Sequence, residues 1–348
     1  MTYRVVQWAT GNVGRHSIRA ILDHPDLELA GVYVTSPAKA GHDAGEIAGR
    51  EPVGVRATAD LDEILALDAD CVAHMPLPSK QIGDDPDQDT KDICRLLESG
   101  KNVVTTVGFV YPKAYGAEVV ARLEAACATG QSSIHGTGVN PGFMAELVPL
   151  TLSSLCARID RILVRESSEF SRYPSPEIIL GMMGFGKSPA DYETHGARYR
   201  AWLGGLVAES VWMVADGLGV ELDGIETSEE VELTDERLEI AAGVLEPGTV
   251  AGQRWVWQGI VGGEPLVVQE AVYKAAPQVA PQWPGSGWLT RLEGSPNITI
   301  DVPHWLNNGL LATAMHAVHA IPAVVDAEPG IRTFLDLPLV VGRHTLGR

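Results

Sequence analysis

The stretch Val5-Val-Gln-Trp-Ala-Thr-Gly-Asn-Val-Gly14-Arg15 decides the fold of this chain. Apolar residues lead into a glycine-rich turn, and the pattern over Val13–Leu22 predicts a helix directly after it. In the register G-x-G-x-x-G, the three positions are occupied by Ala9, Gly11 and Gly14. A strand that runs through such a turn into a helix is typical of a dinucleotide-binding unit.

Each position of the turn has a physical task. The central glycine lets the backbone approach a pyrophosphate, and the last glycine lets the helix pack on the strand. The helix N-terminus offers free N–H groups and its positive dipole end to the phosphates. We therefore predict a cofactor-binding segment of six consecutive residues, namely Thr10, Gly11, Asn12, Val13, Gly14 and Arg15. A tight turn without a ligand is the alternative interpretation.

The end of the second predicted strand, Leu27–Val34, favours one form of the dinucleotide. Sites for NAD usually carry a carboxylate there, which binds the 2′-hydroxyl of the ribose. This chain instead continues Thr35-Ser36-Pro-Ala-Lys39. Because a hydroxyl and an ammonium suit a 2′-phosphate, we expect NADP(H) to be preferred, with NAD(H) possible. Ser36 and Lys39 can also be ordinary loop residues, with the ribose bound elsewhere.

Later strand ends carry further candidates, because doubly wound sheets bind ligands at the carboxyl ends of their strands. The expected cofactor contacts there are His74, Pro76, Thr106, Gly108 and Asn140. The amide of Asn140 can hold either the nicotinamide or the substrate. His74 can also be a buried, hydrogen-bonded histidine of the core.

Organisation changes after about 140 residues. Up to that point short apolar strands alternate with helical patterns, which predicts right-handed βαβ crossovers and a mostly parallel sheet. Helices are then expected over Phe143–Cys156 and Arg198–Leu218, and a strand over Ile159–Glu166. The region from Val220 to Val302 is strand-rich, and an apolar helix, Asn307–Ala320, precedes a proline-rich tail. The fold class is therefore α/β, with a second α+β domain that carries a mixed or antiparallel sheet.

Composition excludes several functions. The chain has 348 residues, enough for about two domains, with 26 Lys plus Arg against 45 Asp plus Glu, a net charge of −19. Such a charge argues against nucleic acid and against anionic membrane surfaces as partners. The four cysteines are widely spaced, so we expect reduced thiols in a cytoplasmic protein. The sequence predicts no metal cluster.

Three segments together resemble a known family. They are the glycine-rich turn at Trp8–Arg15, the stretch Gly136-Thr-Gly-Val-Asn-Pro-Gly-Phe143, and the tail Ile321–Gly330 with Asp336-Leu-Pro338. In these the chain is similar to the dihydrodipicolinate reductase-like family of NAD(P)-dependent oxidoreductases. Within that family it is most similar to the branch of 2,4-diaminopentanoate dehydrogenase and the native amine dehydrogenases.

The resemblance implies a Rossmann domain, residues 1–141, followed by an inserted α+β domain for substrate binding and oligomerisation, residues 142–304. It also implies a C-terminal segment, residues 305–348, whose helix returns to the Rossmann domain. The implied chemistry is hydride transfer between C4 of a nicotinamide and the carbon of a C=N or C=O group.

The chain departs from its relatives at two positions. The His-His-x-x-Lys stretch of dihydrodipicolinate reductase corresponds here to Glu166-Ser-Ser-Glu169-Phe-Ser-Arg-Tyr173, so that reductase activity is not expected. The glutamate expected beyond the fifth strand of amine dehydrogenases corresponds to Val107-Gly108-Phe109. The catalytic candidates are therefore Glu166, Glu169 and Tyr173. The candidates for an apolar substrate pocket are Phe109, Asn140, Met144 and Tyr173; core packing is the competing interpretation.

The favoured function is an NADP(H)-dependent oxidoreductase for a small, mainly apolar ketone, imine or amine. Carbonyl reduction without nitrogen chemistry and non-catalytic sensing of NADP(H) are the alternatives. In the second domain, Trp255, Trp257, Trp283 and Trp288 lie in or beside predicted strands. An exposed apolar sheet face favours association, so we expect a homodimer or a tetramer through this domain, with the homodimer favoured.

Overall fold

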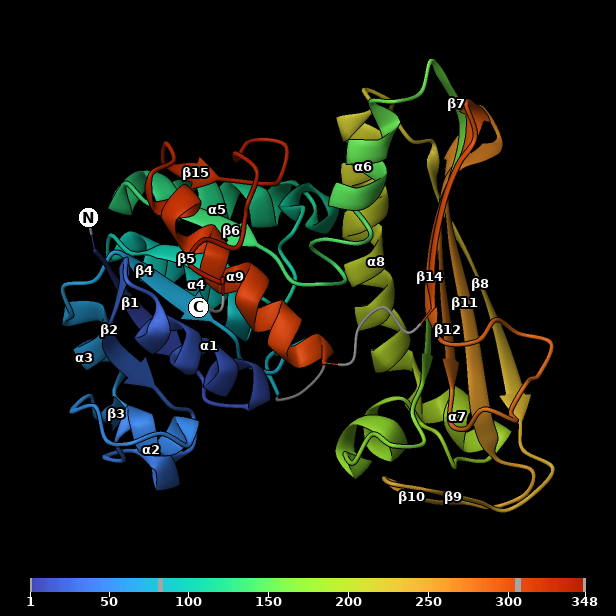
Figure 1. Cartoon of the computed structure of the whole chain (residues 1–348), viewed down its shortest axis with the longest axis horizontal. Coiled ribbons are helices and arrows are strands. Elements are labelled where there is room, and N and C mark those ends of the chain that lie inside the picture. Colours follow the sequence, from blue (N-terminus) through green and yellow to red (C-terminus); the bar gives the residue numbers. More distant parts are fainter. Residues whose placement is uncertain (1, 81–83, 304–307, 347–348) are drawn as a thin grey trace. The chain divides into compact units, whose positions relative to one another are not determined.

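The computed structural model describes residues 2–80, 84–303 and 308–346 of the chain. Two compact units are formed, one by Met1–Phe143 with Asn308–Arg348 and the other by Met144–Asn307 (Figure 1). The expected boundary between residues 304 and 305 lies outside the described residues. Within the described ranges, no helix has both the length and the apolar character needed to cross a membrane.

The first unit contains a seven-stranded parallel sheet in the order β15-β6-β5-β4-β1-β2-β3. Its strands are β1 (Tyr3–Trp8), β2 (Leu27–Tyr33), β3 (Ala57–Thr58), β4 (Cys71–His74), β5 (Asn102–Thr105), β6 (Ser133–Gly136) and β15 (Gly330–Ile331). The predicted doubly wound parallel sheet is thereby confirmed. β3 and β15 were not predicted, because two residues are too few to give a periodic pattern.

Helices cover both faces of this sheet. They are α1 (Asn12–Asp23), α2 (Ala44–Ala48), α3 (Leu61–Ala66), α4 (Gln88–Glu98), α5 (Ala117–Gly130) and α9 (Gly309–Val325), with 3-10 turns η1 (Pro37–Lys39) and η2 (Pro112–Tyr115). Alternation along β1 explains the two layers, because successive side chains point to opposite faces. Val5 belongs to the core with α1 and α9, whereas Val6 belongs to the core with α3, α4 and α5.

The C-terminal helix returns to the first unit as expected, and α9 packs beside α1 (Figure 1). Its predicted end at Ala320 was wrong. The helix continues to Val325 with Pro322 inside its last turn, and the N–H of Asp326 donates to the carbonyl of Pro322. The apolar side chains of Ile321 and Val324 are fully buried, so core packing outweighs the helix-breaking tendency of the proline.

The second unit contains a six-stranded mixed sheet in the order β14-β13-β7-β12-β11-β8. Its elements are α6 (Leu147–Ser153), β7 (Arg158–Glu169), the π-helix η3 (Glu177–Met182), α7 (Pro189–His195), α8 (Ala197–Gly217), β8 (Gly224–Leu233), β9 (Leu238–Ile240), β10 (Gly243–Leu245), β11 (Val250–Val261), β12 (Glu264–Lys274), β13 (Gly287–Ser295) and β14 (Ile298–Pro303). β7 and β12 are parallel and the other pairs are antiparallel, which confirms the predicted α+β unit.

Two predicted boundaries in this region were wrong. The helix expected over Phe143–Cys156 begins only at Leu147, because Pro141 and Gly142 form a turn in which Gly142 has φ 122°. The strand expected to end at Glu166 continues to Glu169. Both carboxylates therefore lie within β7, and neither lies on a loop after the strand.

The tryptophans expected on an open sheet face are buried within the chain. Trp255 and Trp257 stack with ring centroids 5.9 Å apart and are at most 5% exposed. They lie on the face of β11 that packs against α8, where the Trp257 ring lies close to Gly204 of that helix. The exposed aromatic face that motivated the homodimer prediction is thus absent from the described part of β11, because a helix of the same unit covers it.

Candidate functional site

The glycine-rich turn follows β1 directly. Ala9 occupies the first position of the motif with φ 69°, a left-handed conformation that glycine adopts more easily. The buried Gln7 amide supports this conformation by donating to the carbonyl oxygens of Trp8 and Ala9, each at 3.0 Å. Gly11 then caps α1, whose first turn contains no acidic side chain. The helix N-terminus is therefore electrostatically suited to an anion.

The two glycines of this turn have different roles. A Cβ on Gly11 would meet no atom within 4 Å, so the space beside its backbone is free for a ligand. A Cβ on Gly14 would lie only 2.2 Å from the carbonyl oxygen of Ala9. Gly14 therefore permits the contact between strand and helix, and Gly11 leaves an approach to the backbone. This arrangement fits a pyrophosphate.

Lys39 lies beside the turn. Its Nζ donates to both the carbonyl oxygen and the Oγ1 of Thr10, each at 3.2 Å. Ser36 precedes η1 and is exposed near the end of β2. The first carboxylate after β2 is Asp43, whose oxygens accept from the N–H groups of the α2 turn and of residues 53 and 54. No carboxylate in the described loop 34–42 can bind a ribose 2′-hydroxyl.

His74 ends β4, next to β1, where the strand order reverses. Ligands bind at such switch points in doubly wound folds. The side chain is fully buried, and its Nδ1 lies 3.0 Å from the Thr105 hydroxyl. Burial lowers the pKa of His74 to about 3. The imidazole is therefore neutral and is held at the carboxyl edge of the sheet.

Protein stability should fall as the pH is lowered from 6.5, because unfolding lets His74 bind a proton. The pKa is about 3 in the folded chain and 6.5 in an exposed histidine. The contribution is complete above pH 6.5 and is lost towards pH 3, at about 1.4 kcal/mol per pH unit. Urea unfolding at pH 7 and pH 5 measures the change. His74→Gln should make the difference in unfolding free energy between the two pH values about 2 kcal/mol smaller. His42→Gln, at an exposed histidine, should leave this difference unchanged. The assignment is contradicted if His74→Gln shows the same difference as the wild type.

The ends of β5 and β6 bring further candidates to the same edge. Thr106 donates its N–H to the carbonyl of His74, and Gly108 has φ 110°. Phe109 is 3% exposed and packs edge-on against Tyr115. Asn140, which precedes a cis peptide bond, is exposed after β6. Pro76 follows β4 and is half-buried.

Sequence patterns gave no signal for Lys80, which lies beside these aromatic rings. Its Nζ lies 3.3 Å from the centroid of the Tyr115 ring and 5.9 Å from that of Phe109. A single lysine in a loop has no periodicity that could single it out. The structure thus places a cation at the strand end where a glutamate is expected in amine dehydrogenases.

The catalytic candidates lie in the second unit, and two of them belong to the same strand, β7. Glu166 and Glu169 are three residues apart on the strand, so their side chains point to opposite faces. Glu166 is hydrogen-bonded to Tyr273, and burial together with this bond raises the pKa of that tyrosine well above its ordinary value. Glu169 Oε1 accepts from the N–H of Ser171 at 2.5 Å.

The other second-unit candidates are apolar or aromatic. Tyr173 packs edge-on against Phe170, and burial raises the pKa of its phenol. Met144 is 6% exposed. The cofactor candidates of the first unit thus lie at the carboxyl ends of the parallel strands. The remaining candidates, Glu166, Glu169, Tyr173 and Met144, belong to the second unit.

The doubly wound sheet, with its glycine-rich turn at the switch point, defines a protein of the dinucleotide-binding class. The family model of the 2,4-diaminopentanoate dehydrogenase C-terminal domain matches residues 143–345. That of the dihydrodipicolinate reductase N-terminus matches residues 5–80. The chain belongs to the 2,4-diaminopentanoate dehydrogenase family, and the resemblance is confirmed.

Individual relatives agree with this assignment. An amine dehydrogenase of Streptomyces virginiae is 37% identical, with 99% of this chain and 98% of the relative aligned. A 2,4-diaminopentanoate dehydrogenase of Acetoanaerobium sticklandii is 28% identical over 70% of this chain and 68% of its own length. The solved amine dehydrogenase of Mycobacterium smegmatis shares the fold, with a TM-score of 0.81 at 21% identity over 99% and 98% of the two chains.

Proposed function

We propose that this protein catalyses the NADP(H)-dependent interconversion of a small, mainly apolar amine with its ketone. The observation that carries the proposal is the open backbone at Gly11 with Lys39 beside it, in a chain of the amine dehydrogenase family. In the oxidative direction a hydride leaves the amine carbon, a proton leaves nitrogen, and water replaces nitrogen as ammonia is released.

A bound nicotinamide supplies the hydride acceptor or donor. The proposed tasks of the chain's own residues follow from their positions. The turn at Gly11 and the α1 N-terminus bind the pyrophosphate, and Ser36 and Lys39 bind the 2′-phosphate. Glu166, held beside Tyr273, holds or moves the proton of the reacting nitrogen. Glu169 points to the opposite face of β7, where its carboxylate accepts from the N–H of Ser171.

A screen that follows the absorbance of reduced cofactor tests this proposal. Panels of ketones are supplied with and without ammonia. Oxidation of NADPH that requires ammonia supports amination. Tight cofactor binding without turnover in any condition would show that the chain is a sensor instead.

Carbonyl reduction remains the second candidate because of one observation. The position of the expected glutamate is occupied by Phe109, whose ring is buried against Tyr115. If the proton-transfer group of amination is absent, the same hydride chemistry acts on a C=O group. Oxidation of NADPH by ketones at equal rates with and without ammonia identifies this activity.

Replacing Lys39 by alanine should weaken NADPH binding about tenfold or more and leave NADH binding nearly unchanged. A charge-assisted hydrogen bond to phosphate contributes about 1.5–3 kcal/mol, and the 2′-phosphate is absent from NADH. Fluorescence titration with both cofactors measures the effect. Lys91→Ala, at an exposed lysine of α4, should change neither affinity. Equal losses for both cofactors would contradict the assignment of Lys39.

We also propose that two copies associate through the second unit. On the β11 face turned away from α8, Arg254 donates to Glu270 and Glu230 at 2.6 and 2.8 Å, with half-buried Val256 in the next position. A surface of alternating charges around an apolar residue is self-complementary in a two-fold dimer.

Light scattering should give about twice the 37.2 kDa of one chain. Val256→Glu should yield the monomer, because it buries an unpaired carboxylate. Leu155→Glu, at an exposed leucine of the same unit, should leave the dimer intact. A wild-type mass of one chain at micromolar concentration would refute the association.

The cytoplasm is the proposed location. All four cysteines are free, and burial raises the pKa of both Cys71 and Cys127 to about 12. Unreactive thiols without disulfides are typical of proteins from a reducing compartment.

A further inference from the structure

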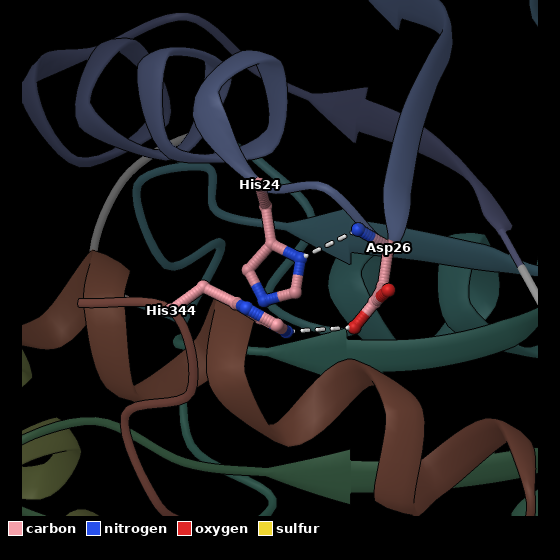
Figure 2. A group of neighbouring side chains, drawn as sticks. All are labelled: His24, Asp26 and His344. Carbon is pink, nitrogen blue, oxygen red and sulfur yellow. Dashed lines mark hydrogen bonds and ion pairs between the residues drawn. The ribbon is translucent and has the colours of Figure 1, made fainter. Parts of the chain in front are cut away.

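Three side chains form a group at the amino end of the parallel sheet, apart from the cofactor edge. His24 and Asp26 lie between α1 and β2, and His344 lies in the C-terminal segment (Figure 2). The Nε2 of His344 is 3.0 Å from Oδ2 of Asp26, and the two imidazole rings meet edge to face with centroids 5.1 Å apart. Each residue offers one ligand atom, and the three atoms lie within 4.8 Å of one another.

We propose that His24, Asp26 and His344 bind a divalent transition-metal ion of the zinc class. Imidazole nitrogens and a carboxylate oxygen are the donors that Zn²⁺ accepts, at about 2.0–2.2 Å. Three atoms no more than 4.8 Å apart share a point within about 2.8 Å of each of them. Shifts of under about 1 Å therefore complete three bonds, and water supplies the fourth.

One backbone hydrogen bond orients the His24 ring, and coordination of an ion breaks it. The Nδ1 of His24 accepts from the N–H of Asp26 at 3.1 Å, which orients the ring. Coordination through Nε2 moves the ring proton to Nδ1, so this hydrogen bond is exchanged for a metal–nitrogen bond. His344 has φ 61°, in the left-handed region that histidine adopts more often than most residues with a side chain.

A cavity of about 740 Å³ beside the group gives an ion and its water ligand access. Its lining includes Tyr3, His24, Asp26, His319, Asp326 and Asp336. Two cationic side chains, Arg332 and Arg343, also line it. Tyr3 begins β1, whereas the glycine-rich turn follows its other end, about 17 Å away along six residues of strand. The bound ion would therefore fasten the C-terminal segment to the unit without contacting the cofactor edge.

Titration of the EDTA-treated full-length protein with Zn²⁺ by calorimetry tests the site. We expect one ion per chain with micromolar or tighter affinity, together with a rise in the melting temperature. His344→Gln and His24→Gln should each weaken binding at least tenfold and abolish the thermal shift, because each removes a ligand. His42→Gln, at an exposed histidine of the same unit, should bind as the wild type does.

Co²⁺ provides a second readout, because its visible absorption reports the coordination of the ion itself. The wild type should give the spectrum of tetrahedral Co²⁺, and added Zn²⁺ should abolish it. His344→Gln should give no such spectrum. The proposal is overturned if Zn²⁺ binds only at millimolar concentration. It is also overturned if folded His344→Gln retains the wild-type affinity for Zn²⁺, or if the wild type and His344→Gln each bind several ions with equal affinity.

Discussion

Gly11→Val is expected to lower the affinity for NADPH at least 100-fold while the protein stays folded. A Cβ at this position enters the open space beside the backbone, which the pyrophosphate needs. Losing two charge-assisted hydrogen bonds to phosphate costs about 3–6 kcal/mol, which corresponds to 100-fold or more. The backbone at Gly11, φ −70° and ψ −167°, is one that valine also adopts, so the fold tolerates the change. Fluorescence titration and thermal melting measure the two effects.

Two further glycines make this experiment specific. Gly224→Val introduces the same side chain into open space at the start of β8 and should change neither binding nor folding. Gly14→Val should instead abolish folding of the first unit, because its Cβ would overlap the carbonyl oxygen of Ala9. If Gly11→Val bound NADPH as tightly as the wild type, the turn would not be the phosphate site.

Glu166→Gln is expected to lower kcat about 100-fold or more, since general acid–base groups contribute about 10²–10⁴-fold. The substitution keeps the size of the side chain and its hydrogen-bonding capacity toward Tyr273, but it removes the group that can accept a proton. KM for NADPH should be unchanged. Steady-state kinetics at a fixed pH provide the measurement.

Glu169→Gln is the matched control, because it makes the same change three residues further along β7 on the opposite face. It should keep kcat within a few-fold of the wild type. A role for Glu166 in packing alone would appear as a lowered melting temperature, with kcat of the folded variant within a few-fold of the wild type. Unchanged kcat in Glu166→Gln would remove this residue from the mechanism.

The sequence alone determined the first unit because its information is local. The order of strand, turn and helix at Val5–Arg15 places the apolar run, the glycines and the helix start within a dozen residues. Backbone geometry then leaves few ways to fold such a segment. The missing carboxylate after β2 could be noticed for the same reason, since its expected position follows from the length of one βαβ unit.

Contacts between distant residues were decided only by the tertiary structure. α8 covers Trp255 and Trp257, although nothing in the alternation of β11 shows which face receives a helix. Glu166 meets Tyr273 because the pairing of β7 with β12 places Glu166 beside Ala271, two residues before Tyr273 on the same face. His24 and His344 are 320 residues apart in the chain and become neighbours because α9 and the C-terminal segment return to the first unit. Periodicity reports which side of an element is apolar, but only chain packing determines which two elements meet.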